Sequence, residues 1–141
     1  MVAPMKVHRH PVRVYYEDTD LAGIVYYANY LRFLERGRSE MVREAGISQL
    51  DMKARGFVFA VRRVEADYLR PARFEDELTV ETRAGGLKGA SFDMPQRVLR
   101  GEEVLLEALV KVVVLDAQGR ATRLPADIRA KLSQITANDG V

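Results

Sequence analysis

The chain of 141 residues is 48% hydrophobic and 30% charged, with a formal net charge of +2, as in an ordinary globular protein with a single core. The absence of cysteine excludes disulfides, thiolate metal sites and a cysteine nucleophile, and it fits a reducing compartment. Positive and negative charges are well mixed, which disfavours the concentrated basic face of a nucleic-acid-binding protein.

No apolar run approaches the roughly 18 residues that a membrane-spanning segment needs. The first ten residues lack the apolar core of a secretion signal, and we therefore expect a cytoplasmic protein. Because no linker or repeat divides the chain, we predict a single domain over residues 1–141, with flexible ends at residues 1–10 and 136–141.

Residues 7–16 alternate between apolar and polar side chains and predict a short, half-buried strand. His8 and His10 are the only histidines of the chain, and we interpret them as solvated residues of an N-terminal arm. A Ser–His–Asp mechanism is therefore not expected, and acid–base chemistry would fall to a carboxylate, a tyrosine or a lysine. The strand is followed by residues 17–23 (EDTDLAG), whose carboxylates, hydroxyl and glycine indicate a loop.

Residues 27–45 have apolar side chains three and four positions apart, the pattern of an amphipathic helix. Gly37 falls on or beside the apolar stripe, where the missing side chain would let another backbone come close. Gly46 is predicted to end the helix as a left-handed cap, with Ile47 folding back as its hydrophobic contact. The acidic loop thus leads directly into the positive end of a long helix.

The second half of the chain is rich in β-branched and aromatic residues separated by turn residues. Strands are predicted at residues 57–69, 77–84, 91–99 and 104–115, and short helices after Ser48 and at Pro125. Pro95 cannot donate to a ladder, which predicts an edge position or a bulge for its strand. The last strand is apolar on both faces, which predicts a central place in the sheet, covered on both sides.

One helix with one apolar stripe and a sheet with a strongly apolar face must bury each other. We therefore predict an α+β fold, in which an antiparallel sheet of about five strands wraps around one long central helix. A sheet with open edges also favours pairing with a second copy, so we expect a homo-oligomer, either a dimer or a tetramer.

The acidic loop has more than one interpretation. Asp-rich turns are common, and the side chains of Glu17, Asp18 and Asp20 could simply bond to nearby backbone N–H groups. A calcium loop would need the later ligands and the closing Glu of an EF-hand, which are missing. The first N–H groups of the following helix, however, have no intrahelical partners. A carboxylate beside such an oxyanion site supplies the parts needed to hydrolyse an activated acyl group.

The run YYEDTDLAGIVYYANYLRFLERGRSEM, followed by FVFAVRRVEADYLRPARFEDELTVET, resembles the hotdog-fold acyl-CoA thioesterases. Within them it is similar to the 4-hydroxybenzoyl-CoA thioesterase-like group, and especially to the bacterial Tol-Pal-associated thioesterases, over residues 12–132. The resemblance implies a hotdog fold, hydrolysis of acyl-CoA thioesters to free acid and coenzyme A, and no metal or redox cofactor.

The resemblance also implies roles for individual residues. Asp20 would be the catalytic carboxylate, acting as nucleophile or general base on the thioester. The backbone N–H of Tyr27 would polarise the carbonyl, at a position where the Tol-Pal-associated relatives often have His. Gly23 matches the motif glycine that lets the backbone pass close to the substrate. Lys88, in the turn GGLKGAS, would bind the phosphates of coenzyme A, or it is a solvated hairpin lysine.

Several alternatives stay open. Hotdog enzymes of another branch use a helix glutamate, which keeps Glu35 and Glu40 as minor candidates, although we interpret Glu35 and Arg38 as an ion pair on a solvated helix face. Tyr68 is interpreted as sheet packing. The chain could instead be a non-catalytic hotdog module that binds an acyl carrier protein or an envelope-associated partner. A hotdog dehydratase is disfavoured because those enzymes need a histidine in the site.

Overall fold

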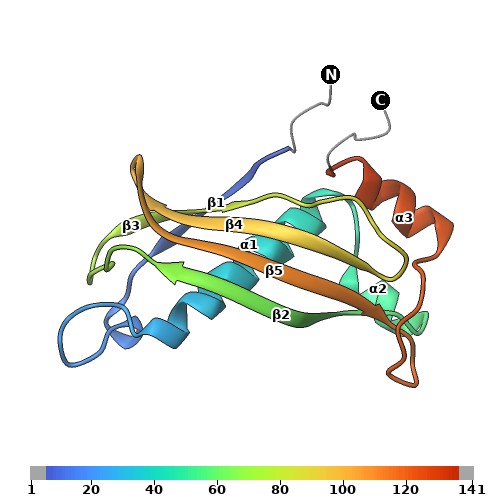
Figure 1. The fold of residues 1–141 in the computed structure, drawn as a ribbon, viewed down its shortest axis with the longest axis horizontal. Coiled ribbons are helices and arrows are strands. Elements are labelled where there is room, and N and C mark those ends of the chain that lie inside the picture. The colour runs from blue at the N-terminus through green and yellow to red at the C-terminus, as the bar shows by residue number, and fades with distance from the viewer. Residues whose placement is uncertain (1–5, 137–141) are drawn as a thin grey trace.

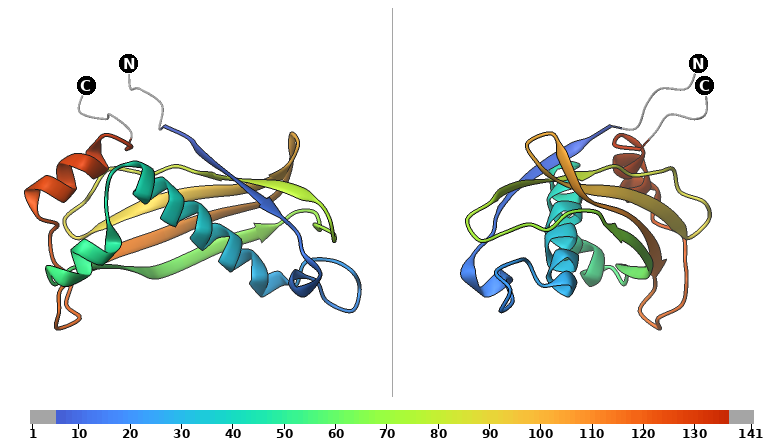
Figure 2. Two further views of the ribbon diagram at one scale, coloured as in Figure 1. Left: turned by 180° about the vertical axis from the view of Figure 1, so that it is seen from behind. Right: turned by 60° about the vertical axis from the view of Figure 1, so that its left-hand side comes forward.

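A computed structural model describes residues 6–136 of the chain. A five-stranded antiparallel sheet curves around one long helix, as Figures 1 and 2 show. The elements in chain order are β1 (His8–Arg13), η1 (Tyr16–Asp18), η2 (Tyr27–Asn29), α1 (Tyr30–Glu44), α2 (Gln49–Ala54), β2 (Val58–Tyr68), β3 (Glu77–Thr82), β4 (Ser91–Arg100), β5 (Glu103–Leu115) and α3 (Ala126–Ser133), where η marks a short 3₁₀ turn. The predicted α+β class, with about five strands around a central helix, is confirmed.

The central helix α1 buries its apolar side against the sheet. The helix comes close to the sheet at Gly37, where an added Cβ would lie only 2.6 Å from Val80 Cγ1 on β3. The predicted close approach is therefore confirmed, although a side chain rather than a backbone fills the space. The helix ends at Glu44, and Gly46 follows with φ of +84°, the left-handed cap expected from the sequence.

The strand order β1-β3-β4-β5-β2 makes β4 an interior strand, so the edge position predicted from Pro95 is wrong. The bulge in this strand lies between Val98 and Leu99, not at the proline. Pro95 is tolerated because it faces Arg83, just after β3 ends at Thr82. Its carbonyl still accepts the Arg83 N–H at 2.9 Å, while its missing N–H removes no bond from the β3–β4 ladder.

The strand β2 forms one outer edge of the sheet (Figure 1), and much of it is exposed. Its apolar residues Val58, Val61 and Val64 are 37%, 48% and 38% exposed. By contrast, β5 lies between β4 and β2, which confirms the central position predicted for it. Leu109 on β5 is nevertheless 38% exposed, so one face of this strand is not covered within a single chain.

The opposite edge strand, β1, begins at His8 and pairs with β3 along its length. The interpretation of His8 and His10 as residues of a solvated arm is therefore wrong, because their backbone is part of the sheet. The side chain of His8 is only 10% exposed, and its Nε2 lies 3.1 Å from the carboxylate of Glu44.

The outer parts of the predicted flexible ends, residues 1–5 and 137–141, lie outside the described residues. Thr136, the last described residue, forms a parallel bridge with Ala84 just after β3. Among the helices of the described part of the chain, none is long and apolar enough to cross a membrane.

Candidate active site

The acidic loop forms a tight turn beside the first residues of the central helix, at one end of the molecule (Figure 2). Its two arms are joined by an antiparallel bridge between Thr19 and Val25, and the N–H of Asp20 donates to the Ile24 carbonyl at 2.9 Å. At the tip, the N–H of Gly23 donates to the Asp20 carbonyl at 3.0 Å. Gly23 has φ of +80°, which explains why the turn requires a glycine.

The carboxylates of this loop have different surroundings. Asp18 is buried, and its oxygens accept hydrogen bonds from the Tyr15 N–H at 2.8 Å and from Asn29 Nδ2 at 2.9 Å. Asp20 is exposed, and its one donor among the described residues is the Ala22 N–H, 2.9 Å from Oδ1. Asp18 is therefore a structural group, whereas Asp20 is available to a substrate.

Asp20 lies in an open groove of about 580 Å³, which we call the Asp20 groove. The acidic loop forms one wall of this groove, and the start of the helix forms the other. The lining includes Asp18, Asp20, Tyr26, Ala28, Asn29 and Arg32. The side chain of Tyr27 lies toward β2 instead, where its ring centre is 6.2 Å from that of Tyr68. The structure thus places Asp20 in the same groove as Ala28 and Asn29 at the start of the helix.

The helix start offers free hydrogen-bond donors. Within the described part of the chain, neither the N–H of Tyr27 nor that of Ala28 meets a protein acceptor. The neighbouring carbonyls are engaged, since Tyr26 accepts the Asn29 N–H at 2.8 Å and Tyr27 accepts the Tyr68 hydroxyl at 2.9 Å. These two N–H groups lie at the positive end of α1 and can stabilise negative charge on an oxygen.

Sequence analysis interpreted Tyr68 as sheet packing and did not predict its hydrogen bond to the helix start. Its hydroxyl connects the end of β2 to the helix start, and its ring meets that of Tyr30 edge-on at 5.5 Å. Tyr30 is buried, and its hydroxyl oxygen accepts the Ala72 N–H at 3.0 Å. Burial raises the pKa of Tyr30 despite the opposing effect of this hydrogen bond. An aromatic residue at the end of a strand gives no local signal of such bonds.

Lys88 lies in the connection between β3 and β4, at the opposite end of the sheet from the acidic loop (Figure 1). Its backbone N–H donates to the Ser91 carbonyl at 2.8 Å, which closes the hairpin. Lys88 and Asp20 are therefore not brought together within one chain. Contact of Lys88 with the same coenzyme A would require a second copy of the protein.

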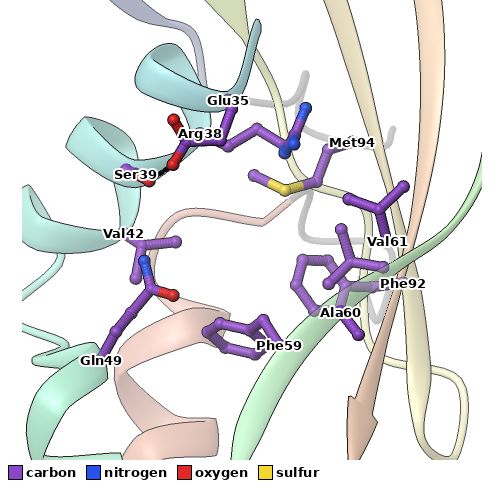
Figure 3. A pocket seen from close by; sticks show the side chains of 11 residues that line it. Glu35, Arg38, Ser39, Val42, Gln49, Phe59, Ala60, Val61, Phe92 and Met94 are labelled. Atoms are coloured by element: carbon purple, nitrogen blue, oxygen red, sulfur yellow. Dashed lines mark hydrogen bonds between the residues drawn. The ribbon is translucent and has the colours of Figure 1, made fainter. Parts of the chain in front are cut away.

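A second, more enclosed cavity of about 160 Å³ lies between α1 and β2, and Figure 3 shows it from close by. Its walls are mainly apolar, with the rings of Phe59 and Phe92 5.7 Å apart, and Arg38 and Gln49 project toward it. Cavities of about 150 Å³ can hold a benzene ring. At about 1.5 Å per helical residue, Arg38 lies about 16 Å beyond Tyr27, so this cavity is separate from the Asp20 groove.

The ion pair predicted between Glu35 and Arg38 is wrong. The carboxylate of Glu35 accepts the Ser39 hydroxyl at 2.8 Å, and Arg38 Nη1 donates to Gln96 Oε1 at 3.0 Å. Arg38 turns toward the sheet, where burial lowers its pKa and the charge of Glu35 opposes that shift. Gln96 is buried and also donates to the Leu34 carbonyl at 2.9 Å, so this side-chain network ties the helix to β4.

A five-stranded antiparallel sheet wrapped around one long helix is the hotdog class of fold. A DHNA-CoA thioesterase from Staphylococcus aureus has the same fold, with a TM-score of 0.87 at 18% identity, covering 93% of this chain and 91% of that one. Residues 14–132 match the family described as the thioesterase-like superfamily. The chain belongs to this superfamily, which confirms the predicted fold, family and enzyme class.

Two relatives share much of the sequence. The acyl-CoA thioester hydrolase YbgC of Escherichia coli O6:H1 is 43% identical over 128 residues, which cover 89% of this chain and 96% of the relative. The structure of a probable thioesterase from Bartonella henselae is 42% identical, with a TM-score of 0.76, and the match covers 85% of this chain and 99% of that one. The likeness to both relatives extends over nearly their whole length.

Proposed function

We propose that this chain hydrolyses acyl-CoA thioesters to a free carboxylic acid and coenzyme A. The observation that supports the proposal most directly is an exposed carboxylate, Asp20, in a groove that begins at free N–H groups of a helix start. The E. coli relative, which is named an acyl-CoA thioester hydrolase, supports the same class of substrate.

In the proposed reaction, the thioester carbonyl enters the Asp20 groove with its oxygen toward the N–H of Tyr27. As a general base, Asp20 takes a proton from a water molecule whose oxygen bonds to the carbonyl carbon. As a nucleophile, Asp20 bonds to that carbon itself, and water then hydrolyses the resulting anhydride. In both routes the C–S bond breaks, the thiolate of coenzyme A leaves and takes up a proton, and the helix N–H stabilises the oxyanion.

We also propose that the working form is a homo-oligomer, either a dimer or a tetramer, that pairs through β2. This strand is an edge with exposed apolar residues, a surface that invites pairing with another strand. If two copies of β2 paired antiparallel, the end of one copy that holds the cavity of Figure 3 would lie beside the Asp20 groove of the other. The acyl group would then reach an enclosed pocket that the open groove lacks.

We also propose a cytoplasmic location. The absence of cysteine agrees with it, because a protein without disulfides needs no oxidising compartment. Acyl carrier protein as an alternative carrier of the acyl group, and the Tol-Pal association implied by the resemblance, stay predictions.

The test is release of free thiol by the purified chain from short-chain, long-chain and aromatic acyl-CoAs, with the matching acyl carrier protein thioesters in parallel. We expect release from at least one acyl-CoA, and a kcat about 100-fold or more lower in Asp20→Asn, since general-base catalysis contributes a factor of this order. The variant should unfold at the wild-type temperature. No release from any thioester, combined with tight binding of acyl carrier protein, would favour a non-catalytic module.

A further inference from the structure

One hydrogen bond joins the edge of the sheet to the start of the central helix. The hydroxyl of Tyr68 donates to the carbonyl oxygen of Tyr27 at 2.9 Å. Tyr68 is the last residue of β2, so this bond fixes Tyr27 relative to the edge of the sheet. The Tyr68 ring is itself held by T-shaped contacts with the rings of Tyr27 at 6.2 Å and Tyr30 at 5.5 Å. The hydroxyl is therefore held in place by its own packing.

The carbonyl of Tyr27 and the N–H of Ala28 belong to the same peptide group. Ala28 lines the Asp20 groove, and in the described part of the chain its N–H donates to no protein acceptor. A hydrogen bond to the oxygen of a peptide group polarises it and makes its N–H a stronger donor. The same bond fixes the orientation of the peptide plane, and with it the direction in which the N–H points.

We propose that Tyr68 is a positioning residue, which orients and polarises the peptide between Tyr27 and Ala28. The N–H of Ala28 then acts as a second donor to the oxyanion, beside the N–H of Tyr27. This inference rests on the proposed function, because it concerns the same site. Tyr68 itself contacts no reacting atom. The contribution of a second donor is large, since removing one oxyanion donor typically lowers kcat by about 100- to 1,000-fold.

The hydroxyl of Tyr68 must be protonated in order to donate to the carbonyl. Burial raises its pKa from the ordinary value of 10.0, and the nearby Tyr27 adds to that shift. The group therefore remains a donor throughout the neutral range, and the hydrogen bond does not depend on pH where the enzyme would work.

The first test is Tyr68→Phe in the full chain, which removes the hydroxyl and keeps the ring. With the acyl-CoA that the wild type hydrolyses fastest, we expect kcat to fall about 10- to 100-fold, because a misoriented group costs a factor of this order. KM should change much less than kcat, since the interaction with the oxygen strengthens as negative charge develops on it in the transition state. A merely structural role of Tyr68 would not separate kcat from KM in this way.

The matched control is Tyr16→Phe. Tyr16 is 81% exposed, its ring lies 6.1 Å from that of Phe74, and its hydroxyl has no partner among the described residues. This variant should keep the wild-type kcat and KM. If Tyr68→Phe has the wild-type kcat at an unchanged unfolding temperature, the positioning role is overturned while the proposed function stands. If the wild type hydrolyses no acyl-CoA, the proposed function and this inference both fail.

The second test measures the polarisation of the bound thioester carbonyl and does not depend on turnover. In Asp20→Asn, which should bind the acyl-CoA without hydrolysing it rapidly, the stretching frequency of the bound thioester carbonyl is measured by Raman difference spectroscopy. We expect a shift to lower frequency relative to the same acyl-CoA in water, and a smaller shift when Tyr68→Phe is added. Equal shifts in the two proteins would show that Tyr68 does not act on the oxyanion donors.

Discussion

The side-chain amide of Asn29 donates to the buried carboxylate of Asp18 at 2.9 Å, and this bond ties the acidic loop to the residue that precedes α1. The other oxygen of Asp18 accepts the Tyr15 N–H, so both oxygens serve to hold the loop. Asp20, two residues further on, keeps its place through backbone bonds and leaves its carboxylate exposed. Asp18 therefore holds the loop in place, whereas the carboxylate of Asp20 is accessible to a substrate.

Replacing Asp18 should therefore reduce stability. Asp18→Ala removes the acceptor of the part-buried Tyr15 N–H and of the Asn29 amide, and at about 0.5–1.5 kcal/mol for each hydrogen bond the loss of both is worth about 1–3 kcal/mol. We expect the free energy of unfolding in urea to fall by that amount. Activity should fall as well, because the loop that places Asp20 loses its anchor. The exposed Glu17 offers a control, since Glu17→Ala should leave the free energy of unfolding unchanged.

The close approach of α1 to β3 gives a second prediction. In Gly37→Ala the new Cβ would meet Val80 Cγ1 at 2.6 Å and Thr82 Oγ1 at 3.0 Å, so either the helix or these side chains of β3 must shift. Overpacking of this kind costs about 1–3 kcal/mol, and thermal unfolding should show the corresponding loss. Arg36→Ala, on the exposed side of the same helix, should have the wild-type stability. Equal unfolding temperatures for Gly37→Ala and the wild type would contradict the close contact.

The buried Glu81 predicts how stability depends on pH. Burial alone would raise the pKa of its carboxyl, but a hydrogen bond and the charge of Arg97, with Arg83 and Arg9, outweigh it and lower the pKa below 4.5. Because the pKa is lower in the folded chain than in the unfolded one, the stabilisation is complete above the unfolded value. It is lost as the pH falls through the folded value.

Urea unfolding at a series of pH values checks this prediction. Glu81→Gln should be less stable than the wild type at neutral pH, and it should lose less further stability when the pH falls below about 4.5. The matched variant is Arg97→Gln, which removes the hydrogen bond and the charge that lower the pKa of Glu81, and its stability should likewise depend less on acid than that of the wild type. The same acid dependence in Glu81→Gln and the wild type would show that Glu81 is not the group responsible.

The sequence predicted those parts of the fold that depend on local pattern. The apolar spacing of α1 and the alternation in the strands report directly which side is buried, so the elements and the α+β class followed from them. The edge position predicted from Pro95 was wrong because an interior strand tolerates a proline where the adjacent strand ends. The end of β3 cannot be recognised from the residues that flank Pro95 in the sequence.

In the candidate site, too, local features could be predicted and contacts between distant residues could not. Asp20 and the helix start are neighbours in sequence, so the motif revealed both. The partners of Arg38 and Tyr68 are 58 and 41 residues away in sequence, so no local pattern could predict their bonds. The position of Lys88 at the far end of the sheet likewise follows from strand pairing rather than from its turn sequence.

The last prediction concerns the exposed edge strand. Val64 on β2 is 38% exposed, and in a paired edge it would be buried against a second copy. Val64→Lys would place an unpaired charge in that interface, which is costly, and lysine is a residue that natural edge strands use to prevent pairing. Light scattering coupled to gel filtration should therefore show a smaller assembly than the wild type, down to a single chain.

Pro11 is exposed on β1, the opposite edge of the sheet, and Pro11→Lys should leave the mass unchanged. If the end of one copy completes the Asp20 groove of another, Val64→Lys should also lose thioesterase activity in proportion to the fraction of single chains. Full activity in a preparation that is entirely single chains would mean that one copy suffices for the site. An unchanged mass in Val64→Lys would instead exclude β2 as the edge that pairs.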